Sequence, residues 1–72
     1  MNLTVIKGLT DGTVVRSFKH YDTPEAAEAA MYYEAWYAVS TDKTVNGIVC
    51  VTSDDAMHED KRVEWSRNTG TT

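Results

Sequence analysis

The segment from Pro24 to Val39 restricts the fold of this chain more than any other feature, because it predicts one long helix in the middle of a short sequence. Thr23 precedes the segment and can cap it, since its hydroxyl can accept a hydrogen bond from an unpaired amide of the first turn. Pro24 suits the first helical position, where its missing N–H costs nothing, and the alanines that follow have high helix propensity. At 1.5 Å per residue the helix is roughly 24 Å long, enough to cross a small sheet.

The segments on either side of this helix predict two pairs of β-strands. β-Branched and aromatic residues, which suit the pleated surface of a sheet, are concentrated in four runs: Leu3–Ile6, Thr13–Phe18, Val45–Thr52 and Arg62–Ser66. The pair Asp11-Gly12 suits a tight hairpin turn, because such turns need positive φ angles. The continuous apolar run at Val45–Thr52 indicates a central strand, and the polar segment Ser53–Asp60 predicts the second turn.

The order of these elements, ββαββ, predicts an α+β fold: a four-stranded antiparallel sheet with one helix packed on one face. In the spatial order 2-1-3-4 every pair of neighbouring strands is antiparallel, and a right-handed crossover carries the helix over the first strand. The order 1-2-3-4 is the alternative. We expect a single domain over residues 1–66, followed by a flexible C-terminal tail at 67–72.

Length and charge restrict the classes of function. The 72 residues suffice for one small core, and the net charge is −4, from 11 acidic and 7 basic residues. Nucleic-acid-binding proteins usually present a basic face to the phosphates, whereas this chain has no Lys/Arg cluster. No run approaches the ~18 apolar residues that span a bilayer, and Met1–Lys7 lacks the basic start and apolar core of a signal peptide. We therefore expect a cytoplasmic protein that binds neither nucleic acid nor a membrane.

Cys50 is the one cysteine, so an internal disulfide is excluded. It lies in the apolar run Ile48–Val51, where a thiol behaves as a small hydrophobic group. We predict that Cys50 is buried and unreactive, and a lone thiol of this kind indicates a reducing compartment.

The predicted helix carries four large aromatic residues on one side: Tyr32, Tyr33, Trp36 and Tyr37. At about 100° per residue, the other side carries Ala27, Met31, Glu34 and Ala38, and the sequence leaves open which side packs on the sheet. The four aromatic residues cover more than about 100° of the helix circumference, so one sheet contact cannot bury them all. We predict that a contiguous aromatic patch stays outside the core and mediates self-association or the binding of a protein partner. A plain solvated surface and a stacking platform for a ligand are the alternatives.

The segment Ser53–Asp60 is the one place where the sequence suggests a metal site, because acidic side chains surround His58. It lacks the ligand spacing of an EF-hand, and Asp is an ordinary turn former. A small metal-binding or enzymatic domain that uses this loop is thus the alternative function, and we predict that the loop binds no ion tightly. Without a catalytic motif in the chain, we expect no enzymatic activity, no catalytic residue and no cofactor. Mimicry of DNA phosphates is a further alternative, for which the acidic excess is small.

Two segments carry a family resemblance: Val14–Ala27, with the pattern VVR…K-x-Y-D-T-x-E-x-A, and Asp54-Asp55 followed by Lys61–Trp65. In these segments the chain resembles short uncharacterised proteins carried by phages and mobile elements of gut Firmicutes. The resemblance implies the same ββαββ fold and a mobile-element origin, and it implies no activity. The longer final turn and the aromatic-rich helix depart from the pattern of that class.

Overall fold

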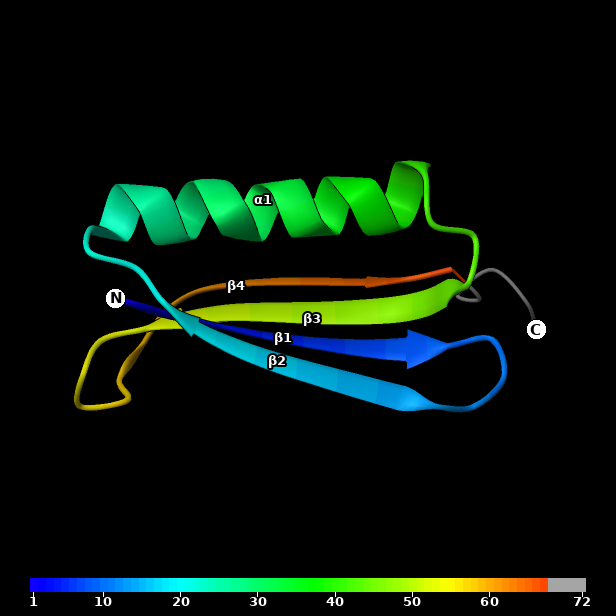
Figure 1. The fold of residues 1–72 in the computed structure, drawn as a ribbon, viewed down its shortest axis with the longest axis horizontal. Coiled ribbons are helices and arrows are strands. Elements are labelled where there is room, and N and C mark those ends of the chain that lie inside the picture. Colours follow the sequence, from blue (N-terminus) through cyan, green and yellow to red (C-terminus); the bar gives the residue numbers. More distant parts are fainter. Residues whose placement is uncertain (68–72) are drawn as a thin grey trace.

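In a computed structural model, which describes residues 1–67, four strands form one antiparallel sheet and a helix covers one of its faces (Figure 1). The elements are β1 (Asn2–Leu9), β2 (Val14–His20), α1 (Pro24–Ser40), β3 (Val45–Ser53) and β4 (Glu59–Ser66). The strand order is β2-β1-β3-β4, so the predicted ββαββ fold and its 2-1-3-4 order are confirmed. β1 and β3 therefore form the middle of the sheet, and β2 and β4 form its two edges.

Helix α1 begins and ends through local hydrogen bonds. The hydroxyl of Thr23 accepts from the N–H of Ala26 at 3.1 Å, and Pro24 occupies the first turn, as the sequence predicted. At the other end the N–H of Thr41 donates to the carbonyl of Tyr37 at 2.8 Å. These contacts satisfy backbone groups that the ends of any helix leave unpaired.

The two hairpin turns share one geometry. In the first, the N–H of Gly12 donates to the carbonyl of Leu9 at 3.0 Å, and in the second the N–H of Met57 donates to Asp54 at 2.9 Å. Gly12 has φ of 90° and Met57 has φ of 67°, both in the left-handed region. Of the pair Asp11-Gly12, only Gly12 takes the predicted positive φ, because a turn of this kind needs one left-handed residue at its end.

The bounds of the strands differ from those that the sequence predicted: β1, β3 and β4 extend further toward the turns, whereas β2 begins one residue later and continues to His20. β1 continues to Leu9, which pairs with Val45 of β3. β4 begins at Glu59 instead of Arg62, because the backbone of Glu59 pairs with that of Ser53. Backbone pairing does not require apolar side chains on a strand that lies at the sheet edge, so the polar composition of this segment concealed its strand.

The core lies between α1 and the helix-facing side of the sheet. Its buried members are Leu3, Val5, Met31, Ala38, Val45, Ile48 and Cys50. Val5 lies directly opposite Cys50 in neighbouring strands, so both side chains share this side of the sheet. The exposed fraction of Cys50 is 0%, so its predicted burial is confirmed.

Arg67, which the sequence assigned to the tail, is held at the end of β4. Its guanidinium donates to the carbonyls of Val45 and Ala38, each at 3.2 Å, and lies 4.8 Å from the ring centre of Trp65. The rest of the predicted tail, residues 68–72, lies outside the described residues.

Candidate protein-interaction surface

Helix α1 packs on the sheet through its small side. Its buried residues are Ala27, Met31, Ala35 and Ala38. Short side chains let the helix approach the strands closely, and Met31, whose exposed fraction is 0%, fills the remaining space. The question that the sequence left open is thereby answered, because the small side faces the sheet and the aromatic side faces away.

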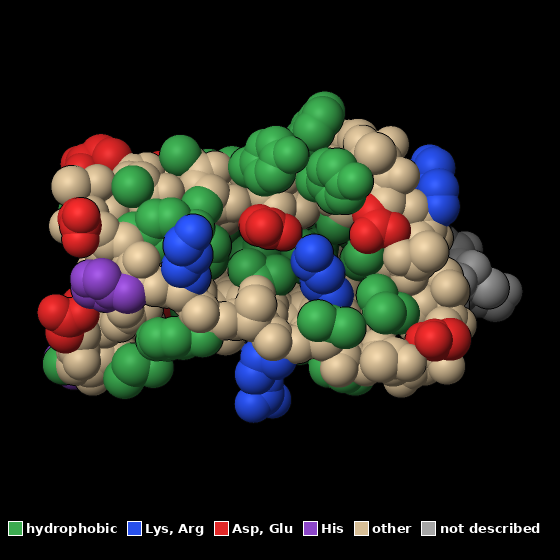
Figure 2. All heavy atoms as spheres, viewed as in Figure 1, with side chains coloured by type: hydrophobic (Ala, Val, Ile, Leu, Met, Phe, Trp, Pro, Cys, Tyr) green, Lys and Arg blue, Asp and Glu red, His purple; other side chains and the backbone are tan. Residues whose placement is uncertain are grey.

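The aromatic side of α1 forms an exposed surface, which we call the aromatic face. Its members and their exposed fractions are Tyr32 (50%), Tyr33 (59%), Trp36 (57%) and Tyr37 (40%). The ring centre of Tyr33 lies 6.1 Å from that of Trp36 and 6.2 Å from that of Tyr37. Figure 2 shows hydrophobic side chains gathered over the helix, with charged side chains along its border. The core is thus complete without these four residues.

Two ion pairs connect α1 to strands on opposite sides of the helix. Lys61 of β4 lies 3.3 Å from Glu28, and Lys7 of β1 lies 3.3 Å from Glu34. The hydrogen bond and the negative charge of Glu28 raise the pKa of Lys61. Exposed pairs of this kind add little free energy. Their positions nevertheless favour one rotation of the helix, the one that holds the aromatic face outward.

The acidic loop uses its polar groups to build a turn. Oδ1 of Asp54 accepts from the N–H of Ala56 at 2.9 Å and from the N–H of His58 at 2.8 Å. The backbone hydrogen bond from His58 is the main cause that lowers the pKa of Asp54. Within residues 1–67, no three side chains of His, Cys, Asp or Glu are grouped so that they could hold a metal ion. The absence of tight ion binding stays a prediction.

The second histidine lies at the same end of the molecule as this loop. Nδ1 of His20 is 2.8 Å from Oδ1 of Asn2 and 4.0 Å from a carboxylate oxygen of Asp55. The structure therefore brings His20 close to the acidic loop and leaves Cys50 in the core. Burial raises the pKa of the Cys50 thiol to about 11, so this thiol stays protonated at neutral pH.

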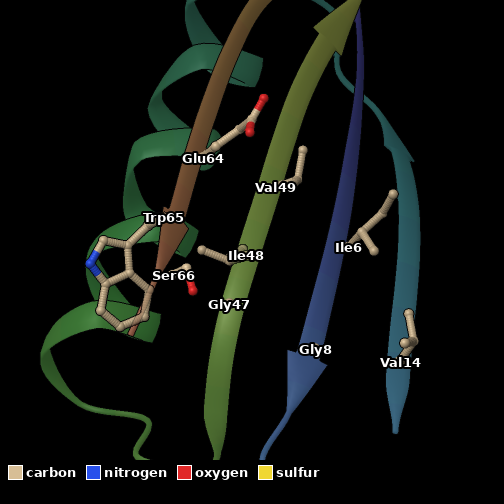
Figure 3. A pocket seen from close by; sticks show the side chains of 9 residues that line it. All are labelled: Ile6, Gly8, Val14, Gly47, Ile48, Val49, Glu64, Trp65 and Ser66. Carbon is tan, nitrogen blue, oxygen red and sulfur yellow. The ribbon is translucent and has the colours of Figure 1, made fainter. Parts of the chain in front are cut away.

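Sequence reasoning missed a second exposed apolar surface, on the face of the sheet that α1 does not cover. Here Val14 and Phe18 of β2 are 64% and 57% exposed. An open depression lies beside them, where Gly8 and Gly47 lack side chains and Ile6 and Val49 form the wall (Figure 3). The predicted fold contained a signal for it. A single helix packs on one face of a sheet, so the other face has no covering layer.

Within the described residues no helix is long and apolar enough to cross a membrane.

Comparisons with known proteins found no relative: no family model, no curated protein and no solved structure matches this chain. The resemblance to proteins of phages and mobile elements therefore stays a prediction, and the candidate surface is defined by its own geometry.

Proposed function

We propose that this chain is a small non-catalytic module that binds a protein partner through the aromatic face. One observation carries the proposal: four large aromatic side chains, 40% to 59% exposed, lie on one side of a helix whose opposite side already completes the core. Contiguous apolar surfaces on small domains mark interaction sites, and Tyr and Trp are prominent among the residues that dominate binding energy.

The spacing of the aromatic residues favours a particular kind of partner. Tyr33 is followed by Trp36 and Tyr37 at i+3 and i+4, which is the pattern of anchors on a helix that fits into an apolar groove. Glu25 and Glu28 lie at the border of the face in the first turns of α1. A groove with aliphatic walls, hydrogen-bond partners for tyrosine hydroxyls and a basic rim would complement this surface.

The charge of the chain and the hydrogen bonds of the acidic loop argue against the other classes of partner. The net charge of −4 and the lack of a basic cluster disfavour nucleic acid. The hydrogen bonds that engage Asp54 and His58 within the turn leave the metal-binding alternative without support. The free, buried thiol of Cys50 supports a cytoplasmic location for this module.

The test compares the wild type with the double variant Trp36→Ser/Tyr32→Lys. Each protein is immobilised on a resin and incubated with an extract of the host cell, and the proteins that it retains are identified. Each retained protein is then purified, and its affinity for the wild type and for the double variant is measured. We expect the double variant to fold and to bind the partner about 1,000-fold more weakly, since two anchor residues that each contribute about 2 kcal/mol together contribute about 4 kcal/mol.

Met57→Ser is the matched control. Met57 is a similarly exposed apolar residue, at 63%, and it lies at the turn between β3 and β4. This variant should bind the partner like the wild type. Equal affinity of the double variant and the wild type, or complete unfolding of the double variant, would refute the proposed role of the aromatic face.

A further inference from the structure

Within residues 1–67, strand β2 is an exposed edge of the sheet with no neighbour on its outer side. It pairs with β1 alone, and all seven of its residues, from Val14 to His20, are exposed. Helix α1 packs chiefly on β3, with smaller contacts to β1 and β4, so β2 projects beyond its cover (Figure 1). An exposed strand edge carries unpaired backbone groups and can pair with another strand.

The hydrogen bonds at both ends of β2 show which backbone groups point outward. Met1 and Tyr21 exchange two bonds, at 3.2 and 2.8 Å, and the N–H of Leu9 donates to Thr13 at 2.8 Å. Because bonded and non-bonded positions alternate along an antiparallel pair, the odd-numbered residues of β2 bond to β1. The residues with outward N–H and C=O groups are the even-numbered ones: Val14, Arg16, Phe18 and His20.

The opposite edge of the sheet is protected by charge. β4 carries five charged residues between Glu59 and Glu64. Arg62 lies 2.8 Å from Glu59 and 3.2 Å from Glu64. Charged side chains on an edge disfavour pairing with another strand. β2 has only Arg16 and Lys19 as fully charged residues and no acidic one.

We propose that β2 pairs antiparallel with β2 of a second copy of this chain, in the register centred on Ser17. This register places each Arg16 opposite Phe18 of the other copy, and each Val15 opposite Lys19. It uses all seven residues of the strand, because Ser17 is the midpoint of Val14–His20. In this register, the residues whose N–H and C=O groups point outward occupy every hydrogen-bonded position between the two copies.

The other registers fit less well. A register centred on Arg16 or on Lys19 places two like charges directly opposite each other, which is destabilising. A register centred on Val15 or on Phe18 pairs fewer residues of the strand. Charge and length thus favour the same register.

This pairing produces a dimer and no larger assembly. It also determines how the two aromatic faces are oriented. Residues opposite each other lie on the same side of a sheet, so the dimer is an eight-stranded sheet with both helices on one side. Its two outer edges are the charged β4 strands, which disfavour further addition. Both aromatic faces would then point the same way, and a partner with two binding sites would gain avidity. The dimer does not depend on the proposed function, because β2 shares no residue with the aromatic face.

The register is tested with single cysteines in the Cys50→Ala background. Ser17→Cys places two thiols opposite each other at a non-hydrogen-bonded position, where the Cα atoms are about 4.5 Å apart and a disulfide can form. Val15→Cys and Lys19→Cys are matched controls on the same side of the same exposed strand. In the proposed register, the thiol at either control position lies about 13 Å from the equivalent thiol of the second copy.

Under mild oxidation we expect the Ser17→Cys protein to form a disulfide-linked dimer about tenfold faster than either control. Sedimentation of the reduced wild type should show a dimer at millimolar concentration, and Ser17→Glu should shift it to monomer by placing two carboxylates opposite each other. The variant Trp36→Ser/Tyr32→Lys should remain a dimer. Equal cross-linking at all three positions, a monomeric wild type at millimolar concentration, or a dimer lost only in the aromatic variant would each overturn the proposal.

Discussion

At the scale of single residues, Met57 is the residue whose backbone least suits its type. It has φ of 67° in a turn whose counterpart, with the same hydrogen bond, carries Gly12 at φ of 90°. A side chain in the left-handed region costs roughly 1–2 kcal/mol, whereas glycine adopts this conformation freely. The side chain of Met57 is 63% exposed and contributes little packing that could offset this cost.

We therefore predict that Met57→Gly stabilises the protein by about 1 kcal/mol. Urea unfolding of the wild type and the variant measures the difference. Gly12→Ala is the matched control and should destabilise by a similar amount, since a Cβ there would meet no atom within 4 Å and only the backbone responds. A Met57→Gly protein less stable than the wild type would contradict this account of the turn.

Burial of Cys50 makes the free energy of unfolding depend on pH. Burial raises the pKa of its thiol from 9.0 to about 11, so the folded protein keeps a proton that the unfolded chain loses near pH 9. The stability that comes from this thiol is fully present below pH 9 and is lost as the pH rises toward 11. A two-unit difference in pKa corresponds to about 2–3 kcal/mol.

We predict that the unfolding free energy falls less steeply between pH 9 and 11 in Cys50→Ala than in the wild type. Chemical unfolding at several pH values gives both slopes. In the same range the native thiol should react with a labelling reagent far more slowly than the thiol in denaturant. Labelling at the denatured rate would show that Cys50 is accessible.

At the scale of elements, the orientation of α1 decides what the surface offers. The helix carries apolar residues on both sides, and its rotation follows from size: Ala27 and Ala38 let it approach the sheet, whereas Trp36 would hold it away. The flanking pairs Glu28–Lys61 and Glu34–Lys7 agree with this rotation.

This orientation predicts opposite effects for substitutions on the two sides of the helix. Ala38→Leu should destabilise the fold by about 1–3 kcal/mol, because the buried side has no room for a larger residue. Trp36→Ser should change the unfolding free energy by less than about 1 kcal/mol, since its side chain is largely exposed. Urea unfolding of both variants checks the order, and the reverse order would mean that the aromatic side belongs to the core.

At the scale of the whole molecule, four carboxylates make the fold sensitive to acid. Hydrogen bonds from Thr13 and Thr44 lower the pKa of Asp11 and Asp42, respectively. The backbone N–H of His58 and the guanidinium of Arg62 do the same for Asp54 and Glu59. A lowered pKa stabilises the fold above the ordinary values of 3.8 and 4.5, and this contribution is lost as the pH falls below them.

We therefore expect the thermal midpoint to fall as the pH is lowered below about 4. The fall should be shallower in Asp54→Asn, which keeps the acceptor oxygen of the turn and removes the titrating group. Asp55→Asn changes the neighbouring carboxylate outside this set and serves as the control. Identical acid profiles for Asp54→Asn and the wild type would exclude a contribution from Asp54.

The features that the sequence alone determined are those set by neighbouring residues. Thr23 and Pro24 start α1 because capping involves residues within one turn of each other, and Gly12 ends a hairpin turn because its own φ is positive. The apolar run around Cys50 was sufficient to predict burial. The strand order could be predicted because few topologies of a ββαββ chain keep a right-handed crossover and an antiparallel sheet.

The tertiary structure alone decided the features that depend on distant partners. β4 begins at Glu59 because Ser53 lies across from it, and Arg67 is ordered because the carbonyls of Ala38 and Val45 accept from its guanidinium. The sequence predicted an aromatic patch and could not assign the inward side of the helix, since alanines and aromatics are both apolar. The sheet beneath admitted only the small side, and one helix could not also cover β2, so the packed molecule leaves the aromatic face and the β2 edge exposed.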